Sequence, residues 1–75
     1  MEAFGRRVRA LRLAVGASGA EVGGAALTIP GLALRAGINA SVLGEIERGR
    51  VNVTLMTVRR LAQALGVAMT TLFED

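Results

Sequence analysis

The chain has 75 residues, 52% of them hydrophobic, and a net charge of +3 from nine basic and six acidic side chains. This length suits one small domain, and the absence of cysteine excludes a disulfide framework and a thiolate metal site. Because histidine is absent too and the acidic residues are few and scattered, the usual groups of acid–base and nucleophilic catalysis are missing, so we expect no enzyme.

An apolar stripe predicts a first helix over residues 2–15, which we expect Gly16 to end. The members of the stripe recur at steps of four, three and four residues: Phe4, Val8, Leu11 and Val15. Arginines surround the stripe, as expected for a helix with one buried and one solvated face.

The segment "ASGAEVGGAAL", residues 17–27, is predicted to be an insertion outside the core. Only Val22 and Leu27 could bury much area in it, and its glycines raise the entropy lost on ordering. A short helix capped by Ser18 is the alternative interpretation. With either, deletion of residues 18–27 is expected to leave a folded domain.

Two short helices come next, over residues 30–36 and 40–48. Pro30 is compatible only with a first helical turn, and Asn39 is a suitable N-cap for the second helix. The turn "AGIN" between them contains Gly37, which can adopt the left-handed conformation of a helix end.

A fourth helix is predicted over residues 55–65, with Thr54 as its N-cap and Gly66 at its end. Its apolar stripe consists of Leu55, Val58, Leu61, Ala62 and Leu65. A last turn over residues 69–74 closes the chain. The expected fold is therefore all-α, a compact five-helix bundle that forms a single domain over residues 1–75, with no strand.

Residues 30–48 have the organisation of a helix-turn-helix unit, two short helices joined by a tight turn. Ala33 and Ala36 are small enough to let the helices cross closely, Ile38 lies beneath the turn, and Leu43 and Ile46 anchor the second helix. From this pattern alone, the same residues could equally be ordinary packing positions of any small all-α domain.

The stretches "LALRAGINASVLGEIERG" and "NVTLMTVRRLAQALGVAMTTLF" resemble the phage-repressor type of helix-turn-helix domain, the Cro/C1 or XRE family. The resemblance covers residues 4–16 and 28–73, and its most specific parts are "AGI", "IERG" and "LAQALGV". Within the family, "IERGRVNVTL" is similar to the small controller proteins of restriction–modification systems.

This resemblance implies a regulator that binds operator DNA, usually as a two-fold dimer, with the helix over residues 40–48 in the major groove. The positions that would face base edges are Ala40, Ser41 and Glu45, with Gly44 close by. The positions that would contact phosphates are Asn39, Arg48, Arg50 and Asn52. A methyl group such as that of Ala40 can contact a thymine methyl, a hydroxyl can donate or accept, and a carboxylate can accept from a cytosine amino group.

The resemblance also implies a structural ion pair between Arg12 and Glu47 beneath the second motif helix, so that Glu47 contacts no base. One family feature is absent. Where relatives usually have a phosphate-binding glutamine, this chain has Ile29, followed by Pro30, which has no amide proton.

A homodimer is expected to form through the C-terminal region, with apolar area from Met69, Leu72 and Phe73. The alternative role for Leu72 and Phe73 is to close the core of the monomer.

A different class of function is also open, a protein-interaction module such as an antitoxin or adaptor that keeps the fold without strong DNA binding. The small outer face of the second motif helix and Ile29 favour that class, whereas the flanking arginines and "IERGR" favour DNA.

The longest uncharged runs, residues 22–34 and 61–73, have 13 residues each and are too short to span a bilayer. Arg9 and Arg12 interrupt the apolar part of the N-terminal segment, so we do not expect a signal peptide. The expected location is the cytoplasm, and no membrane, metal, cofactor or small-molecule ligand is expected.

Overall fold

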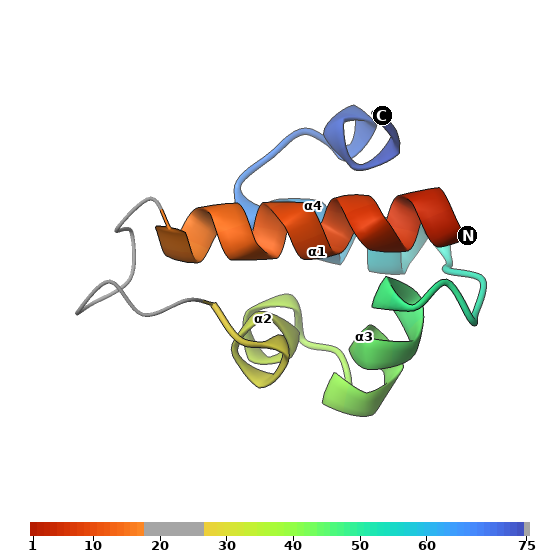
Figure 1. The fold of residues 1–75 in the computed structure, drawn as a ribbon, viewed down its shortest axis with the longest axis horizontal. Helices are drawn as coiled ribbons and strands as arrows, with labels where there is room; N and C mark the ends of the chain where they lie inside the picture. Colours follow the sequence, from red (N-terminus) through yellow and green to blue (C-terminus); the bar gives the residue numbers. More distant parts are fainter. Residues whose placement is uncertain (18–26, 75) are drawn as a thin grey trace.

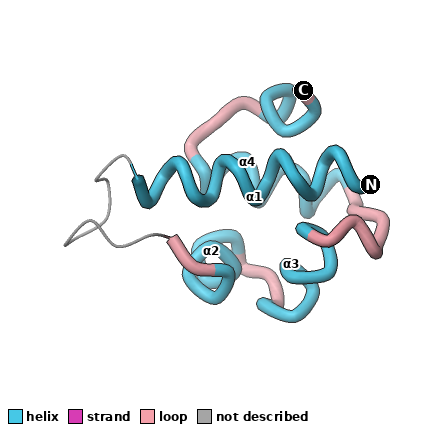
Figure 2. The backbone as a smooth tube through the Cα atoms, viewed as in Figure 1, coloured by secondary structure: helices cyan, strands magenta, loops and turns pink. Residues whose placement is uncertain are grey.

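The computed structural model describes residues 1–17 and 27–74, which form helices and the turns between them (Figures 1 and 2). The four α-helices are α1 (Glu2–Ala17), α2 (Ile29–Ala36), α3 (Ala40–Glu47) and α4 (Leu55–Leu65), followed by a 3-10 helix, η2 (Met69–Phe73). No strand occurs in these described residues. The predicted all-α class is therefore confirmed.

The predicted count of five α-helices is wrong, because the last element, η2, is a 3-10 helix of five residues. Its N-cap residue, Ala68, makes no side-chain hydrogen bond, and a segment this short gains little from α-helical pairing. The amide of Thr71 donates to the carbonyl of Ala68 instead, three residues earlier.

Side-chain caps fix where three of the helices begin. The amide oxygen of Asn39 accepts from the backbone N–H of Ser41 at 2.8 Å and of Val42 at 3.2 Å, as predicted for the start of α3. Thr54 caps α4 in the same way, and Thr28 caps α2, which begins at Ile29, one residue before the predicted start.

Left-handed glycines follow the ends of α2, α3 and α4, with φ of 70° at Gly37, 73° at Gly49 and 72° at Gly66. The fourth glycine that was predicted to end a helix does not do so, because α1 continues through Gly16 to Ala17. A glycine permits a helix end but does not impose one.

In Figure 1, α1 lies across the molecule with α2 and α3 on one side, η2 on the opposite side and α4 behind it. Helix α1 contacts α3, α4 and η2, while α2 packs against both α3 and α4. Aliphatic and aromatic side chains form the core between them, and the largest fully buried ones are Leu32, Leu43, Ile46, Leu61, Leu72 and Val8.

Two expectations about the core are corrected. Leu55 belongs to the predicted stripe of α4, yet it is 75% exposed, because it is the first residue of the helix and lies beyond the packed turns. Leu27, which was assigned to the insertion, is only 5% exposed and belongs to the core.

The boundaries predicted for the insertion therefore do not hold, since Ala17 ends α1 and Leu27 is a core residue. A deletion of residues 18–27 would include Leu27 and remove its buried apolar area, so we expect it to lower the stability of the domain. The proposed short helix capped by Ser18 lies outside the described residues.

Candidate nucleic-acid interface

Helices α2 and α3 form a helix-turn-helix unit around the turn at Gly37–Asn39. The backbone N–H of Gly37 donates to the carbonyl of Leu34, and that of Ile38 donates to the carbonyl of Ala33. Ala33 and Ala36 are buried, and Ile38 packs against the core beneath the turn. The predicted packing roles of these small residues are thus confirmed.

The inner face of α3 is anchored by Leu43 and Ile46, which are 0% and 1% exposed. The C-terminal end of this face carries Glu47, which is also buried, at 8% exposure. A buried carboxylate is costly unless it is paired and hydrogen-bonded, and here it is both.

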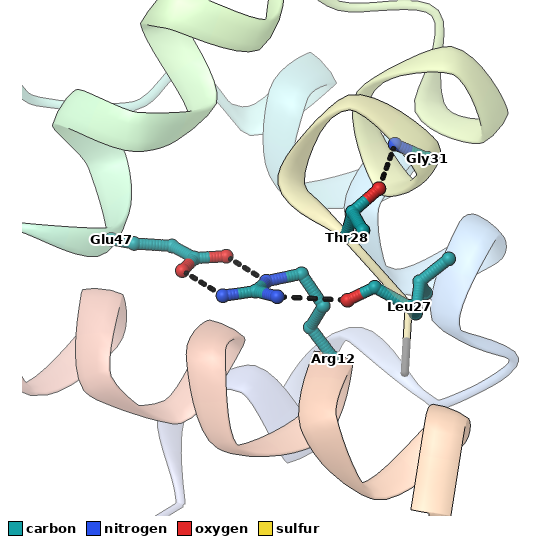
Figure 3. A network of polar contacts seen from close by, with 5 residues as sticks. All are labelled: Arg12, Leu27, Thr28, Gly31 and Glu47. Carbon is teal, nitrogen blue, oxygen red and sulfur yellow. Dashed lines mark hydrogen bonds and ion pairs between the residues drawn. The ribbon is translucent and has the colours of Figure 1, made fainter. Parts of the chain in front are cut away.

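Arg12 of α1 makes a bidentate ion pair with Glu47, as Figure 3 shows. Its Nε lies 2.8 Å from Oε2 and its Nη2 lies 3.0 Å from Oε1. Its Nη1 donates to the carbonyl of Leu27 at 2.8 Å, so the guanidinium joins α1, α3 and the segment before α2. This arrangement fixes the end of α3 relative to α1.

Gly5 allows α1 and α3 to approach each other closely. A Cβ atom at this position would lie 2.3 Å from the carbonyl oxygen of Ile46 and 2.6 Å from that of Glu47. Sequence reasoning missed this residue. The available signal was a glycine within a helix beside its apolar stripe, which costs about 1 kcal/mol relative to alanine and so usually has a packing reason.

The outer face of α3 carries an open groove of about 510 Å³. Its lining comes from α3 together with one residue of α2 and two residues that follow α3: Ile29, Ala40, Ser41, Val42, Gly44, Glu45, Arg48 and Val51. The groove therefore combines an apolar floor with a hydroxyl, a carboxylate and a guanidinium.

The residues expected to face base edges all line this groove, with different accessibility. Ser41 is exposed, whereas Ala40 and Glu45 are half-buried. Gly44 lies on this outer face close to the base-facing positions, but it is buried, because the guanidinium of Arg48 lies over it.

Three apolar groove residues were not assigned to the interface from sequence: Ile29, Val42 and Val51. Val42 is 47% exposed and directly precedes the buried Leu43, so the helical step turns it away from the core. Its position outside the apolar stripe was the signal that could have identified it.

Glu45 lies between two of the arginines that were expected to contact phosphates. Its Oε1 is 3.3 Å from Nη2 of Arg48, and its Oε2 is 3.9 Å from Nη1 of Arg50. The three side chains remain accessible, at 37% for Glu45, 53% for Arg48 and 66% for Arg50. Sequence reasoning did not foresee that these charges would be paired with one another.

The other two expected phosphate contacts lie before and after α3 along the chain. Asn39 is exposed at its N-terminus, where the capping bonds use the amide oxygen. Asn52 is exposed in the loop that leads to α4.

The residues assigned to a dimer interface separate into two roles. Leu72 is 0% exposed within a single chain, so it closes the core and cannot offer area to a partner. Phe73 is 60% exposed, although its ring lies 5.1 Å from that of Phe4, and Met69 is half-buried.

Within residues 1–17 and 27–74, no helix is both long and apolar enough to cross a membrane. The same residues contain no group of acidic side chains that could hold a metal ion.

The tight turn, the buried anchors of α3 and its accessible outer groove define a helix-turn-helix domain. A family model described as "Helix-turn-helix domain" matches residues 3–72. The chain therefore belongs to the helix-turn-helix family, in the Cro/C1 or XRE type that its sequence resembles.

Among solved structures, the chain is similar to the restriction–modification controller protein C.AhdI from Aeromonas hydrophila. The two are 36% identical, the match covers 96% of this chain and 94% of that chain, and the TM-score is 0.81. A comparison with curated proteins found no match.

Proposed function

We propose that this protein is a sequence-specific transcriptional regulator that binds operator DNA as a homodimer. The observation that carries the proposal is the accessible outer groove of α3, on a helix whose inner face is anchored by Leu43, Ile46 and the Arg12–Glu47 pair. A rigid helix with an uncovered polar and apolar face suits the major groove of duplex DNA.

The similarity to C.AhdI supports a role as a controller of a restriction–modification system. In this proposal the protein is a cytoplasmic regulator without catalytic activity that senses no small molecule. Its effect on transcription would then depend on its own concentration.

In this proposal the exposed residues around α3 have two roles. Arg48, Arg50, Asn39 and Asn52 contact phosphates, which contribute affinity and fix the position of the helix on DNA. Ser41, Glu45 and the methyl groups of the groove contact base edges and contribute specificity. Ile29 and Val51 widen the apolar floor, which suits thymine methyl groups.

The test begins with selection of tight binders from random-sequence duplex DNA, followed by titrations at two salt concentrations. Replacing Arg48 or Arg50 with alanine is expected to weaken binding to the selected duplexes and to lower the salt slope by about one, because one phosphate contact is lost. Ser41→Ala is expected to change which sequence is preferred. Arg59→Ala, at an exposed position on α4, removes the same charge outside the helix-turn-helix unit and serves as the control.

If the wild-type protein showed no salt-dependent binding to any duplex, the regulator proposal would be wrong. That result would favour the other class of function, a protein-interaction module that uses the apolar groove.

The homodimer is proposed to form through Met69 and the exposed ring of Phe73, since two half-sites one DNA turn apart require two α3 helices. Phe73→Ser is expected to raise the dimer dissociation constant by about tenfold or more, as for a buried aromatic residue at an interface. Sedimentation at micromolar concentration measures this, with Leu34→Ser, at an 84% exposed leucine of α2, as the control. A wild-type chain that is monomeric both free and on DNA would contradict the dimer.

A further inference from the structure

The charged part of the outer groove is a cluster of three side chains: Glu45, Arg48 and Arg50. The carboxylate of Glu45 has one oxygen 3.3 Å from Arg48 and the other 3.9 Å from Arg50. Both guanidinium groups are therefore turned toward a residue in the middle of the recognition surface, although phosphates would lie at the edges of a DNA groove.

The local backbone builds this cluster. Glu45 and Arg48 are three residues apart, so both lie on the same face of α3. Gly44 leaves room for the Arg48 guanidinium, since a Cβ there would lie 3.3 Å from Nη2. The left-handed turn at Gly49 then reverses the chain, and the backbone N–H of Arg50 donates to the carbonyl of Glu45 at 3.0 Å.

The ion pairs of Glu45 with Arg48 and Arg50 can be replaced by contacts with DNA. An accessible ion pair contributes little net stability, because water and salt screen it and ordering the side chains costs entropy. A DNA phosphate competes for the same guanidinium groups, and the carboxylate is itself repelled by phosphates. The carboxylate accepts hydrogen bonds only, so among base edges in the major groove it can pair with the amino group of cytosine or of adenine but not with the acceptors of thymine or guanine.

We infer that Glu45 makes the phosphate contacts of Arg48 and Arg50 conditional on the base pair that it faces. Opposite a cytosine amino group, the carboxylate gains a new partner and both arginines can turn to phosphates. Opposite a base acceptor, the carboxylate stays paired with the two arginines and is repelled by the acceptor and the phosphates. Non-cognate DNA is therefore bound weakly. Glu45 therefore contributes to specificity by weakening the binding of non-cognate sequences as well as by pairing with the cognate base. This inference rests on the proposed DNA-binding function.

The test compares Glu45→Gln with Glu74→Gln, because both raise the net charge by one and Glu74 is exposed at the end of η2, away from the groove. Titrations use the selected operator and a scrambled duplex of equal length. For Glu45→Gln we expect about five- to tenfold tighter binding to scrambled DNA and a salt slope steeper by about one to two. Affinity for the operator should change by less than that, so the specificity ratio falls. Glu74→Gln should leave the ratio unchanged.

A double-mutant cycle identifies the cause of this change. If Glu45 holds Arg48 in the wild-type protein, Arg48→Ala should weaken binding to scrambled DNA more in the Glu45→Gln background than in the wild type. Changing single cytosine–guanine pairs of the operator to thymine–adenine should reveal one pair whose roughly tenfold preference disappears in Glu45→Gln. Helix content by circular dichroism checks that each variant is folded.

Several outcomes would overturn the inference while leaving the proposed function intact. These are an equal effect of Glu45→Gln on both duplexes, an equal effect of Glu74→Gln, or additive effects of the Glu45 and Arg48 changes. Absence of binding by the wild-type protein would instead overturn the proposed function itself.

Discussion

Replacing Arg12 with methionine is expected to lower the free energy of unfolding by about 3–5 kcal/mol, because the buried Glu47 carboxylate then has no compensating charge. The carbonyl of Leu27 loses its donor in the same variant. A domain of 75 residues has a total stability of roughly 4–11 kcal/mol, so this single change removes a large part of it. Chemical denaturation followed by circular dichroism measures the loss.

The double variant Arg12→Met/Glu47→Met separates the charge from the packing. With both charges gone, the main remaining defect is the unpaired Leu27 carbonyl. We therefore expect the free energy of unfolding of the double variant to be about 1 kcal/mol lower than that of the wild type. Arg9→Met is the control, since it removes the same charge at an exposed position of α1 and should change stability by less than about 0.5 kcal/mol. Additive losses from the two single substitutions would show that the pair is not coupled.

Gly5→Ala is expected to destabilise the protein by about 2 kcal/mol or more. At a solvent-exposed position in a helix, the same substitution usually stabilises a protein. The added methyl group would lie 2.3 Å and 2.6 Å from two backbone oxygens at the end of α3. Backbone atoms cannot rotate away as a side chain can, so α1 and α3 must separate, which costs more than the gain of about 1 kcal/mol in helix propensity.

The sign of the stability change caused by Gly5→Ala distinguishes a close contact between α1 and α3 from an exposed helix position, where the same substitution would stabilise the protein. Ala10→Gly, at an exposed position of α1, measures the propensity contribution in the same helix and should cost about 1 kcal/mol. Gly5→Ala should also weaken DNA binding, since it displaces α3 from its anchored position. A Gly5→Ala variant that melts at a higher temperature than the wild type would contradict the close approach of the two helices.

Helix limits and the family were largely predictable from sequence, because the features that set them are local. An N-cap such as Asn39 or Thr54 bonds to amides two or three residues ahead, and a glycine such as Gly37 adopts positive φ within its own turn. These interactions need no distant partner, so the helix limits predicted from these residues agree with the structure. The end of α1 was predicted two residues too early, and the last element was predicted as an α-helical turn although it is the 3-10 helix η2, whose N-cap residue makes no side-chain hydrogen bond.

The arrangement of the interface depended on the tertiary structure. Gly5 and Leu27 are separated from their partners in α3 and α1 by long stretches of chain, so their roles arise only when the helices cross. Gly44 was expected close to the base-facing positions, but it lies under the guanidinium of Arg48. The pairing of Glu45 with Arg50 requires the chain reversal at Gly49. Periodicity specifies which face of a helix is apolar, whereas the distance and angle between two helices are set by how their side chains pack together.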